Sequence, residues 1–201
     1  MSRDFWNDRF GGEAYIYGEA PNDFLAQSVA HLPAGGRVLS LAEGEGRNAV
    51  FLAGQGFAVT GVDYAEAGRP KALALAERRG ARIDYVIADL ADFDLGIAAW
   101  DGVVGIFSHL PSALRADLFA RLRQALRPGG VIVMELYHPD QLGFGTGGPK
   151  DLDLLAAPAD LLALLDGFEI RRAERVEREV VEGSFHTGPA CVTQLIARKP
   201  G

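Results

Sequence analysis

Residues 37–49 read RVLSLAEGEGRNA, a short apolar run followed by a glycine-rich turn. The segment from Gly44 to Ala49 satisfies the fingerprint G-x-G-x-x-G/A, in which a strand passes through a tight turn into a helix. The next apolar run, residues 58–62, ends at Asp63, at the spacing where an acidic residue binds ribose hydroxyls. Residues 37–63 therefore predict one βαβ unit with a nucleotide-type binding loop.

The rest of the chain continues the alternation of strands and helices. Further helices are expected over residues 71–79 and after Pro111, and further strands over residues 83–89, 103–107 and 131–136. Proline and glycine in Arg127-Pro128-Gly129-Gly130 are expected to stop the second of these helices. Residues 168–181 and 192–197, joined by the turn-rich segment 182–189, predict an antiparallel pair. The expected fold is α/β, doubly wound and Rossmann-like: a mostly parallel seven-stranded sheet with a C-terminal antiparallel hairpin and helices on both faces.

Length and composition fit one domain, residues 1–201, in a reducing compartment. Cys191 is the only cysteine, so no intramolecular disulfide can form. The N-terminus has no apolar leader and no later run is long enough to cross a bilayer, so we expect a cytoplasmic protein without a membrane partner. The formal net charge of −7 and the lack of a basic stripe argue against nucleic acid and favour a small or protein-borne substrate.

Two segments flank the predicted sheet core. Residues 1–32 are too aromatic for a disordered tail, so we expect them to pack as a cover over the carboxyl edge of the sheet; their aromatic residues include Trp6, Phe10, Tyr15, Tyr17 and Phe24. Residues 138–157 begin with a run rich in glycine and proline and are predicted to form a lid loop.

The charges of the glycine loop bear on its ligand. A dinucleotide places its pyrophosphate at the N-terminus of the helix after the loop, where Glu43 and Glu45 flank the site. A carboxylate about 4 Å from a phosphate costs on the order of 4 kcal/mol at an effective dielectric of 20, unless the side chain turns away. S-adenosylmethionine has no phosphate and carries a sulfonium and an ammonium, so the acidic loop favours it. NAD, and a tight turn without a ligand, remain as alternatives.

Several motifs together resemble class I S-adenosylmethionine-dependent methyltransferases: residues 38–49, Asp63, Asp89-Leu90 and residues 127–130. Within that superfamily, the Gly-Arg-Asn ending of the loop and the opening segment from Trp6 to Leu25 look similar to the bacterial tellurite-resistance TehB-like group. The resemblance implies transfer of a methyl group to a small-molecule acceptor, with S-adenosylhomocysteine as product. An NAD-dependent oxidoreductase and a noncatalytic S-adenosylmethionine-binding module remain as alternative functions.

The resemblance also implies a role for each matching residue. Backbone from Ala42 to Gly46 would contact the methionine part, Asp63 the ribose hydroxyls and Asp89 the adenine amino group. Leu90 and Tyr64 would sandwich the adenine ring, and Phe107 would line the methionine pocket. The implied cofactor-binding residues are Ala42, Glu43, Gly44, Glu45, Gly46, Asn48, Asp63, Tyr64, Asp89, Leu90 and Phe107.

The loop departs from the family pattern at two positions. The family has an acidic residue where Ser40 stands and a glycine where Ala42 stands. We hypothesise that Glu43 replaces the missing carboxylate. Purely structural roles also stay open, since Asp63 could cap a helix and Asp89 could shape a turn.

No residue is an unmistakable catalyst. Methyl transfer from a sulfonium needs mainly positioning and desolvation of the nucleophile, so a general base is optional. The candidates are Tyr17, His109 and His186, the last in a Gly-x-x-His segment that resembles one in the TehB-like group. The four histidines lack metal-ligand spacing and one cysteine cannot build a zinc cluster, so no metal is expected.

Overall fold

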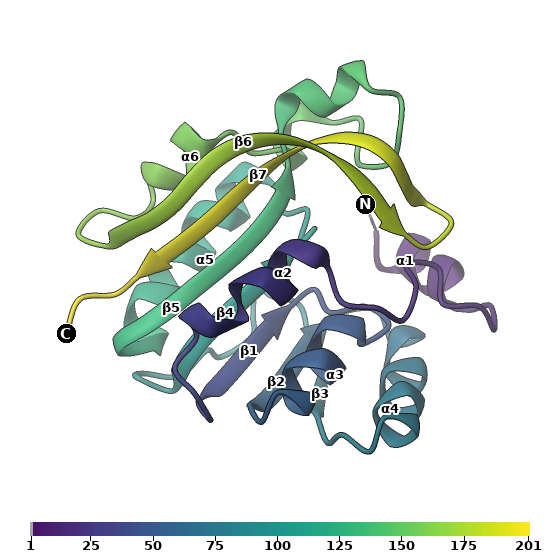
Figure 1. Ribbon diagram of the computed structural model, residues 1–201, viewed down its shortest axis with the longest axis horizontal. Coiled ribbons are helices and arrows are strands. Elements are labelled where there is room, and N and C mark those ends of the chain that lie inside the picture. The colour runs from purple at the N-terminus through teal and green to yellow at the C-terminus, as the bar shows by residue number, and fades with distance from the viewer. Residues whose placement is uncertain (1) are drawn as a thin grey trace.

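The computed structural model describes residues 2–201. Within these residues a seven-stranded sheet has the order β3-β2-β1-β4-β5-β7-β6 (Figure 1). Strands β3, β2, β1, β4 and β5 run parallel, and β7 runs antiparallel to both β5 and β6. The strands are β1 (Arg37–Leu41), β2 (Ala58–Asp63), β3 (Asp84–Ile87), β4 (Trp100–Ile106), β5 (Leu126–Tyr137), β6 (Glu169–Glu182) and β7 (His186–Arg198). The predicted sheet is confirmed.

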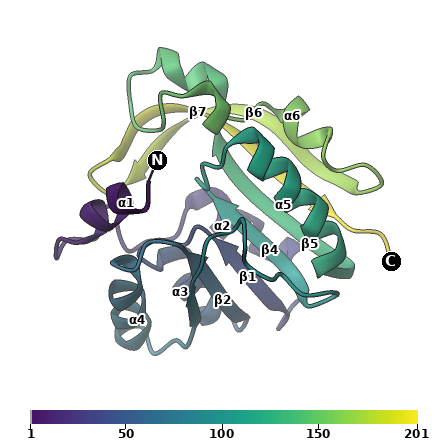
Figure 2. The same ribbon diagram turned by 180° about the vertical axis from the view of Figure 1, so that it is seen from behind.

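Helices cover both faces of this sheet, as predicted. Helices α2 and α3 lie in front of it in Figure 1, and α5 lies in front in the reverse view of Figure 2. Each face has its own apolar core, because α5 contributes Leu118 and Leu122 to one cluster, while α2 and α3 contribute Phe24 and Leu52 to the other. The helices are α1 (Arg3–Phe10), α2 (Asp23–Ser28), α3 (Arg47–Gly54), α4 (Gly68–Arg78), α5 (Ser112–Ala125) and α6 (Pro158–Leu162), with short 3₁₀ turns at Val29–His31, Pro139–Gly143 and Leu152–Leu154.

The helix stop predicted at residues 127–130 was placed too late. Helix α5 ends at Ala125, and Leu126 is already extended and pairs with Trp100 of β4. The proline–glycine segment instead forms an irregularity inside β5, with Gly129 at φ +79°, and the β4–β5 register shifts there. The left-handed glycine was predicted correctly, but it re-aims a strand rather than capping a helix.

The C-terminal hairpin is longer than predicted. Its turn spans only residues 183–185, so β7 begins six residues before the expected Val192 and contains Pro189. Strand β5 pairs with β7 only from Val192 onward, so the proline lies where β7 has a neighbour on one side alone. Proline is tolerated at such an edge because no ladder hydrogen bond is lost.

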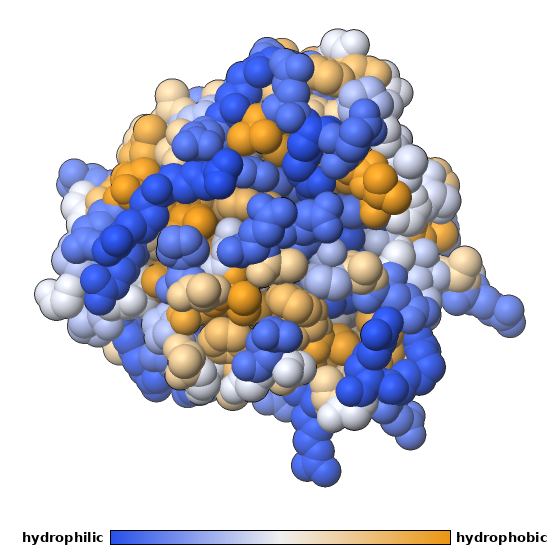
Figure 3. Space-filling view, viewed as in Figure 1, coloured by the Kyte–Doolittle hydropathy of each residue, from blue (hydrophilic) through white to orange (hydrophobic). Residues whose placement is uncertain are grey.

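The long hairpin brings its tip to the N-terminal segment. The Ser184 N–H donates to the Ile16 carbonyl at 3.0 Å, and Figure 1 shows the β6–β7 turn beside α1. Most residues of β6 are exposed, and hydrophilic side chains follow this strand across the upper part of Figure 3. Among residues 2–201, no helix combines the length and apolar character that a membrane span requires.

Candidate functional site

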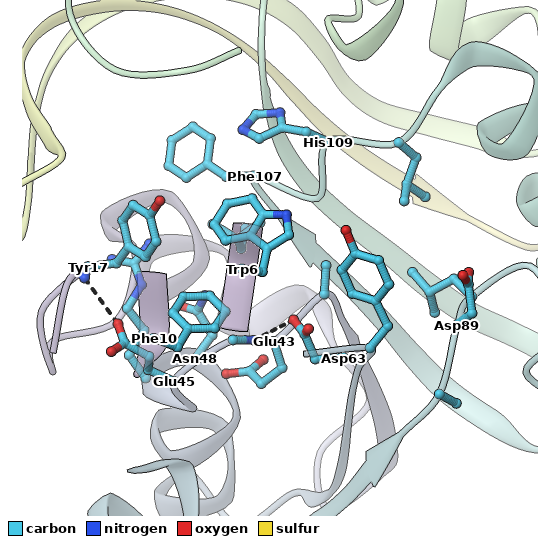
Figure 4. Close-up of a pocket in the computed structure, with 18 of the residues that line it drawn as sticks. Trp6, Phe10, Tyr17, Glu43, Glu45, Asn48, Asp63, Asp89, Phe107 and His109 are labelled. Carbon is cyan, nitrogen blue, oxygen red and sulfur yellow. Dashed lines mark hydrogen bonds between the residues drawn. The ribbon is translucent and has the colours of Figure 1, made fainter. Parts of the chain in front are cut away.

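The sheet order reverses between β1 and β4, so the chain leaves their carboxyl ends in opposite directions and opens a crevice. A cavity of about 290 Å³ occupies this position (Figure 4). Every predicted cofactor-binding residue except Gly46 lines it, as do the catalytic candidates Tyr17, His109 and His186. The cavity thus brings together residues from six segments of the chain.

Gly46 has a different role from the expected close approach to a ligand. A Cβ at Gly46 would lie 2.5 Å from the Ala72 Cβ on α4, and the residue has φ +92°. This glycine therefore allows the start of α3 to pack against α4. Gly44, at φ +61°, faces the Phe10 ring, which a Cβ would approach to 3.1 Å.

Ala42 adopts the same left-handed backbone without being glycine. Its φ is +49°, at the position where the resembled family has glycine. An L-residue in this region costs about 1–2 kcal/mol. The loop therefore keeps the backbone shape of the family motif at the expense of local strain.

Glu43 is buried beneath the loop. One carboxylate oxygen accepts from the Ser40 hydroxyl, and the other accepts from the Ala49 N–H at 2.9 Å. The second bond satisfies a free N–H in the first turn of α3, whose own N-cap, Gly46, has no side chain to do so. Burial raises the pKa of Glu43 to about 7, although both hydrogen bonds oppose the shift.

Glu45 binds the N-terminal segment rather than facing a ligand. Its carboxylate accepts from the N–H groups of Ile16 at 2.8 Å and Tyr17 at 3.3 Å, and it forms an ion pair with Lys71. The Lys71 ammonium also donates to three backbone carbonyls of the same segment, those of Phe10, Gly12 and Ala14.

These contacts correct the electrostatic reason for preferring S-adenosylmethionine to NAD. That reason needed two free carboxylates at the loop, but Glu45 is neutralised by Lys71 and Glu43 has a pKa near neutrality. Both side chains turn to partners within the protein. The choice of cofactor therefore depends on other observations.

Asp63, at the end of β2, is 6% exposed and lines the cavity. Its carboxylate accepts from the Gly44 N–H at 2.9 Å and the Ala65 N–H at 2.8 Å, and burial raises its pKa. It does not cap α4, whose N-cap is Ala67. Each oxygen keeps further acceptor capacity toward the cavity.

Asp89 combines the two roles that the sequence left open. Its carboxylate accepts from the Ala91 N–H at 3.0 Å, which shapes a turn, and the residue also lines the cavity next to Leu90. In Figure 4 Asp63 and Asp89 lie at one end of the cavity, Tyr17, Phe107 and His109 lie away from them, and Trp6 lies between.

Aromatic rings gather at the end of the cavity away from Asp89. The His186 ring centroid lies 4.4 Å from that of Tyr17 and 4.7 Å from that of Phe107. Tyr137 stacks on Phe107 at 4.6 Å and on His109 at 5.5 Å. Tyr137 was not among the predicted site residues, although its place at the end of the fifth parallel strand is a signal for this edge of the sheet.

Both histidines of this group are neutral. Burial lowers the pKa of His109 to about 4, and burial with nearby positive charges lowers that of His186 to about 2. Three of their ring nitrogens make no hydrogen bond of standard geometry within residues 2–201: both nitrogens of His109 and Nδ1 of His186. These nitrogens are fully buried, and His109 also interacts with the backbone of Leu154.

The predicted lid, residues 138–157, lies behind the wall of this cavity. In the described chain none of its residues lines the cavity. Gly148 packs on the Tyr137 ring, which a Cβ there would approach to 2.8 Å. Gly147 lies close to His186, and the Leu154 backbone interacts with His109, so the loop supports the rings of the cavity wall from behind. Trp6, Phe10 and Tyr17 of the N-terminal segment supply the cavity wall instead.

A buried ionic group lies behind the cavity and was also missed. Arg47 pairs with Glu182, and Arg178 pairs with Glu182 and with Glu135, which is fully buried. The mixed charges of residues 171–179 are typical of a solvated strand face. That holds for most of β6, but Arg178 turns inward because Glu135 on β5 offers it a buried partner.

One cluster elsewhere could be read as a metal site. In the described chain, ligand atoms of His138, Asp140 and Cys191 lie within 4.8 Å of one another. The Asp140 carboxylate is bound by Arg175 at 2.6 Å, and His138 Nδ1 accepts the Asp140 N–H. Both groups are already engaged.

Comparison with known proteins identifies similar chains. A family model described as a methyltransferase domain matches residues 38–130. A probable S-adenosylmethionine-dependent methyltransferase of Mycolicibacterium smegmatis is 31% identical over 188 residues, which cover 90% of this chain; the chain spans 66% of that relative's length.

Two solved structures share the fold. One concerns the conversion of a disulfide bond into a thioacetal group during echinomycin biosynthesis, with a TM-score of 0.79 and 20% identity over 100% of this chain and 92% of the other. The other is TehB from Haemophilus influenzae, with a TM-score of 0.71 and 17% identity over 98% of this chain and 66% of that one.

Proposed function

We propose that this chain is an S-adenosylmethionine-dependent methyltransferase, as are the family model and the relative that it matches, and that it methylates a small-molecule acceptor bound at the aromatic end of its cavity. The observation that carries this proposal is the division of one cavity into two ends. Carboxylates at strand termini lie at one end, and aromatic rings with two neutral imidazoles lie at the other.

The residues at the carboxylate end fit the cofactor. Asp63 has spare acceptor capacity for the ribose hydroxyls. Asp89 would accept from the adenine amino group, with Tyr64 and Leu90 on the ring, since all three residues line the cavity. The left-handed turns at Ala42 and Gly44 shape the backbone that would hold the methionine part. When bound, S-adenosylmethionine supplies an electrophilic methyl group on a sulfonium.

Glu43 supports the cofactor loop from below. Its carboxylate lies against the Ser40 hydroxyl, so it fills the space near the family's acidic position. Through Ala49 it also fixes the start of α3. We assign it a positioning role in cofactor binding.

The aromatic end orients an acceptor and excludes water from it. Tyr17, Phe107 and His186 form a wall of rings. Imidazoles with pKa values of about 4 and about 2 are weak bases. The site therefore suits a nucleophile that reacts without losing a proton to the protein, such as a thiolate or a chalcogen oxyanion.

The N-terminal cover, residues 2–32, favours a small acceptor. Residue 1 of the predicted cover lies outside the described residues. Trp6, Phe10 and Tyr17 close the cavity, and Glu45 and Lys71 hold this segment in place. A lid role for residues 138–157 stays a prediction, and it would act through Tyr137, His109 and His186.

A methyl-transfer assay tests the proposal. The protein is incubated with methyl-tritiated S-adenosylmethionine and a panel of thiols, selenite, tellurite, phenols and amines. We expect label in a small product from the soft nucleophiles, and an Asp63→Asn protein serves as the cofactor-binding control. Label that enters only proteins or nucleic acids added to the assay would contradict the small-molecule acceptor.

A further inference from the structure

Arg9 carries a positive charge beside the aromatic end of the cavity. It lies in the last turn of α1 and is half-buried. Three rings contact its guanidinium: the centroids of Phe5 and Phe185 lie 4.6 and 4.5 Å from Cζ, and that of Trp6 lies 5.8 Å away. Among residues 2–201 it forms a hydrogen bond to Tyr17 but no ion pair. Aromatic faces therefore hold this cation in place without a carboxylate to neutralise it.

The hydrogen bond joins Arg9 to a residue that lines the cavity. Arg9 Nη1 donates to the Tyr17 hydroxyl oxygen at 3.0 Å. A guanidinium can only donate, so this bond occupies a lone pair of the phenol oxygen and leaves the hydroxyl proton free to donate elsewhere. In the described chain the Tyr17 hydroxyl donates to no other group. Figure 4 shows its oxygen at the end of the ring that is turned away from Glu45 and toward Phe107.

The other charged groups around Tyr17 are already paired. Glu45, which accepts from the Tyr17 N–H, forms an ion pair with Lys71. Arg47, whose charge also acts on Tyr17, is paired with Glu182. Burial raises the pKa of Tyr17, although the bound guanidinium opposes the shift, so the ring stays a neutral phenol and keeps its proton. The uncompensated charge at this end is therefore positive, and a free hydroxyl donor lies beside it.

We propose that Arg9 and Tyr17 form an anion-binding pair, in which the Tyr17 hydroxyl donates to a negatively charged acceptor and Arg9 positions and polarises that hydroxyl. The inference rests on the proposed function and narrows its acceptor to an anion. Hydrogen bonds to an ionised partner are roughly twice as strong as neutral ones, and a hydroxyl that accepts from a cation becomes a stronger donor. Arg9 is a positioning residue, because in the described chain Tyr17, and not Arg9, lines the cavity.

The test follows the ionisation of a coloured probe. 4-Nitrophenol ionises near neutral pH and only its anion is yellow, so absorbance reports how much of the bound probe is anionic. The probe is titrated into the protein with saturating S-adenosylhomocysteine at a series of pH values. A site that prefers the anion lowers the ionisation midpoint of the bound probe. We expect wild type to lower it by about one pH unit, which corresponds to a tenfold preference for the anion.

Substitutions at the pair locate the effect. Tyr17→Phe keeps the ring and removes the donor, so the midpoint should return to that of the free probe. Arg9→Met should lose most of the shift, and Arg9→Lys, which keeps the charge, should retain part of it. Arg171→Met removes an exposed arginine of β6 as the matched control and should behave like wild type. A merely structural role for Arg9 would change the affinity for the probe without moving its midpoint.

The inference and the proposed function fail in different ways. An unshifted or raised midpoint in wild type overturns the anion-binding pair, as does a lowered midpoint that Tyr17→Phe retains. Selenite, a smaller anion followed by isothermal titration, covers a site too narrow for the aromatic probe, and its affinity should fall by about tenfold in Tyr17→Phe. If neither probe binds wild type, the pair is also overturned. If wild type does not bind S-adenosylhomocysteine, the proposed function fails, and the two probes titrated without it still decide the role of the pair.

Discussion

The buried carboxylate of Glu43 accepts a hydrogen bond from the hydroxyl of Ser40, three residues before it. Ser40 stands on β1 where the methyltransferases that the chain resembles have an acidic side chain, and Glu43 supplies a carboxylate from the loop instead. The same carboxylate holds the Ala49 N–H at the start of α3. The turn between strand and helix is thus stabilised by one side chain beneath it.

Glu43 should make stability depend on pH. Its pKa is about 7 in the folded protein against 4.5 as the ordinary value, so folding favours the protonated carboxyl. Its contribution is complete below about pH 4.5 and is lost as the pH rises through 7, a loss on the order of 3 kcal/mol. The free energy of unfolding is measured in urea at pH 5 and pH 8 for wild type and Glu43→Gln. Relative to wild type, Glu43→Gln should be more stable at pH 8 than it is at pH 5, because glutamine stays uncharged. Parallel pH dependences in the two proteins would refute this.

Ala42→Gly should stabilise the protein. Relief of a left-handed alanine gains about 1–2 kcal/mol, and the greater freedom of glycine in the unfolded chain costs about 0.5–1 kcal/mol, leaving roughly 0.5–1 kcal/mol. Ala98→Gly is a matched control, because Ala98 is exposed, has φ +45° and does not line the cavity. Chemical denaturation should show a gain in both. A loss of stability in Ala42→Gly alone would show that its methyl group packs favourably.

His109 and His186 should not titrate in the physiological range. Burial keeps both imidazoles neutral, with pKa values of about 4 and about 2. Their ¹⁵N imidazole signals should stay in the neutral form from pH 5.5 to pH 8.5, and methyl transfer should show no inflection from them there. A midpoint near pH 6.5 in either signal, lost in the matching His→Asn variant, would disprove the buried neutral state.

Lys71→Met should loosen the N-terminal cover. The ammonium joins Glu45 to the carbonyls of Phe10, Gly12 and Ala14, so its removal frees four acceptors. We expect hydrogen exchange of residues 3–17 to accelerate by about tenfold, while the central strands keep their protection. Lys150→Met, at an exposed position, controls for the lost charge. Unchanged exchange in Lys71→Met would mean that aromatic packing alone closes the cavity.

Much of the fold follows from local sequence. Strands such as residues 58–63 have β-branched runs between turn residues, and their order along the chain dictates a parallel sheet. The hairpin boundaries could not be predicted from local sequence, because Gly188-Pro189 is typical of a turn when the strands beside it are unknown. Only the one-sided pairing of β7 at that point explains why the strand continues through the proline.

The candidate site was predicted as a set of positions rather than as a set of contacts. Strand ends converge on one edge, so Asp63, Asp89 and Phe107 could be placed together from the sequence. The partners of Glu45 and Arg47 could not, because Lys71 and Glu182 are distant in the chain and are brought near only by the fold. Free charges were assumed where the structure has ion pairs.

Titration with S-adenosylhomocysteine tests the central claim most directly. We predict saturable one-to-one binding to wild type at least tenfold tighter than that of NADH. Asp63→Asn should weaken it by at least tenfold, because Asp63 is the buried acceptor at the end of β2, whereas Asp92→Asn, on an exposed neighbouring turn, should not. The assignment of this cavity to S-adenosylmethionine would be contradicted if S-adenosylhomocysteine gave no binding heat and no melting shift while NADH bound saturably.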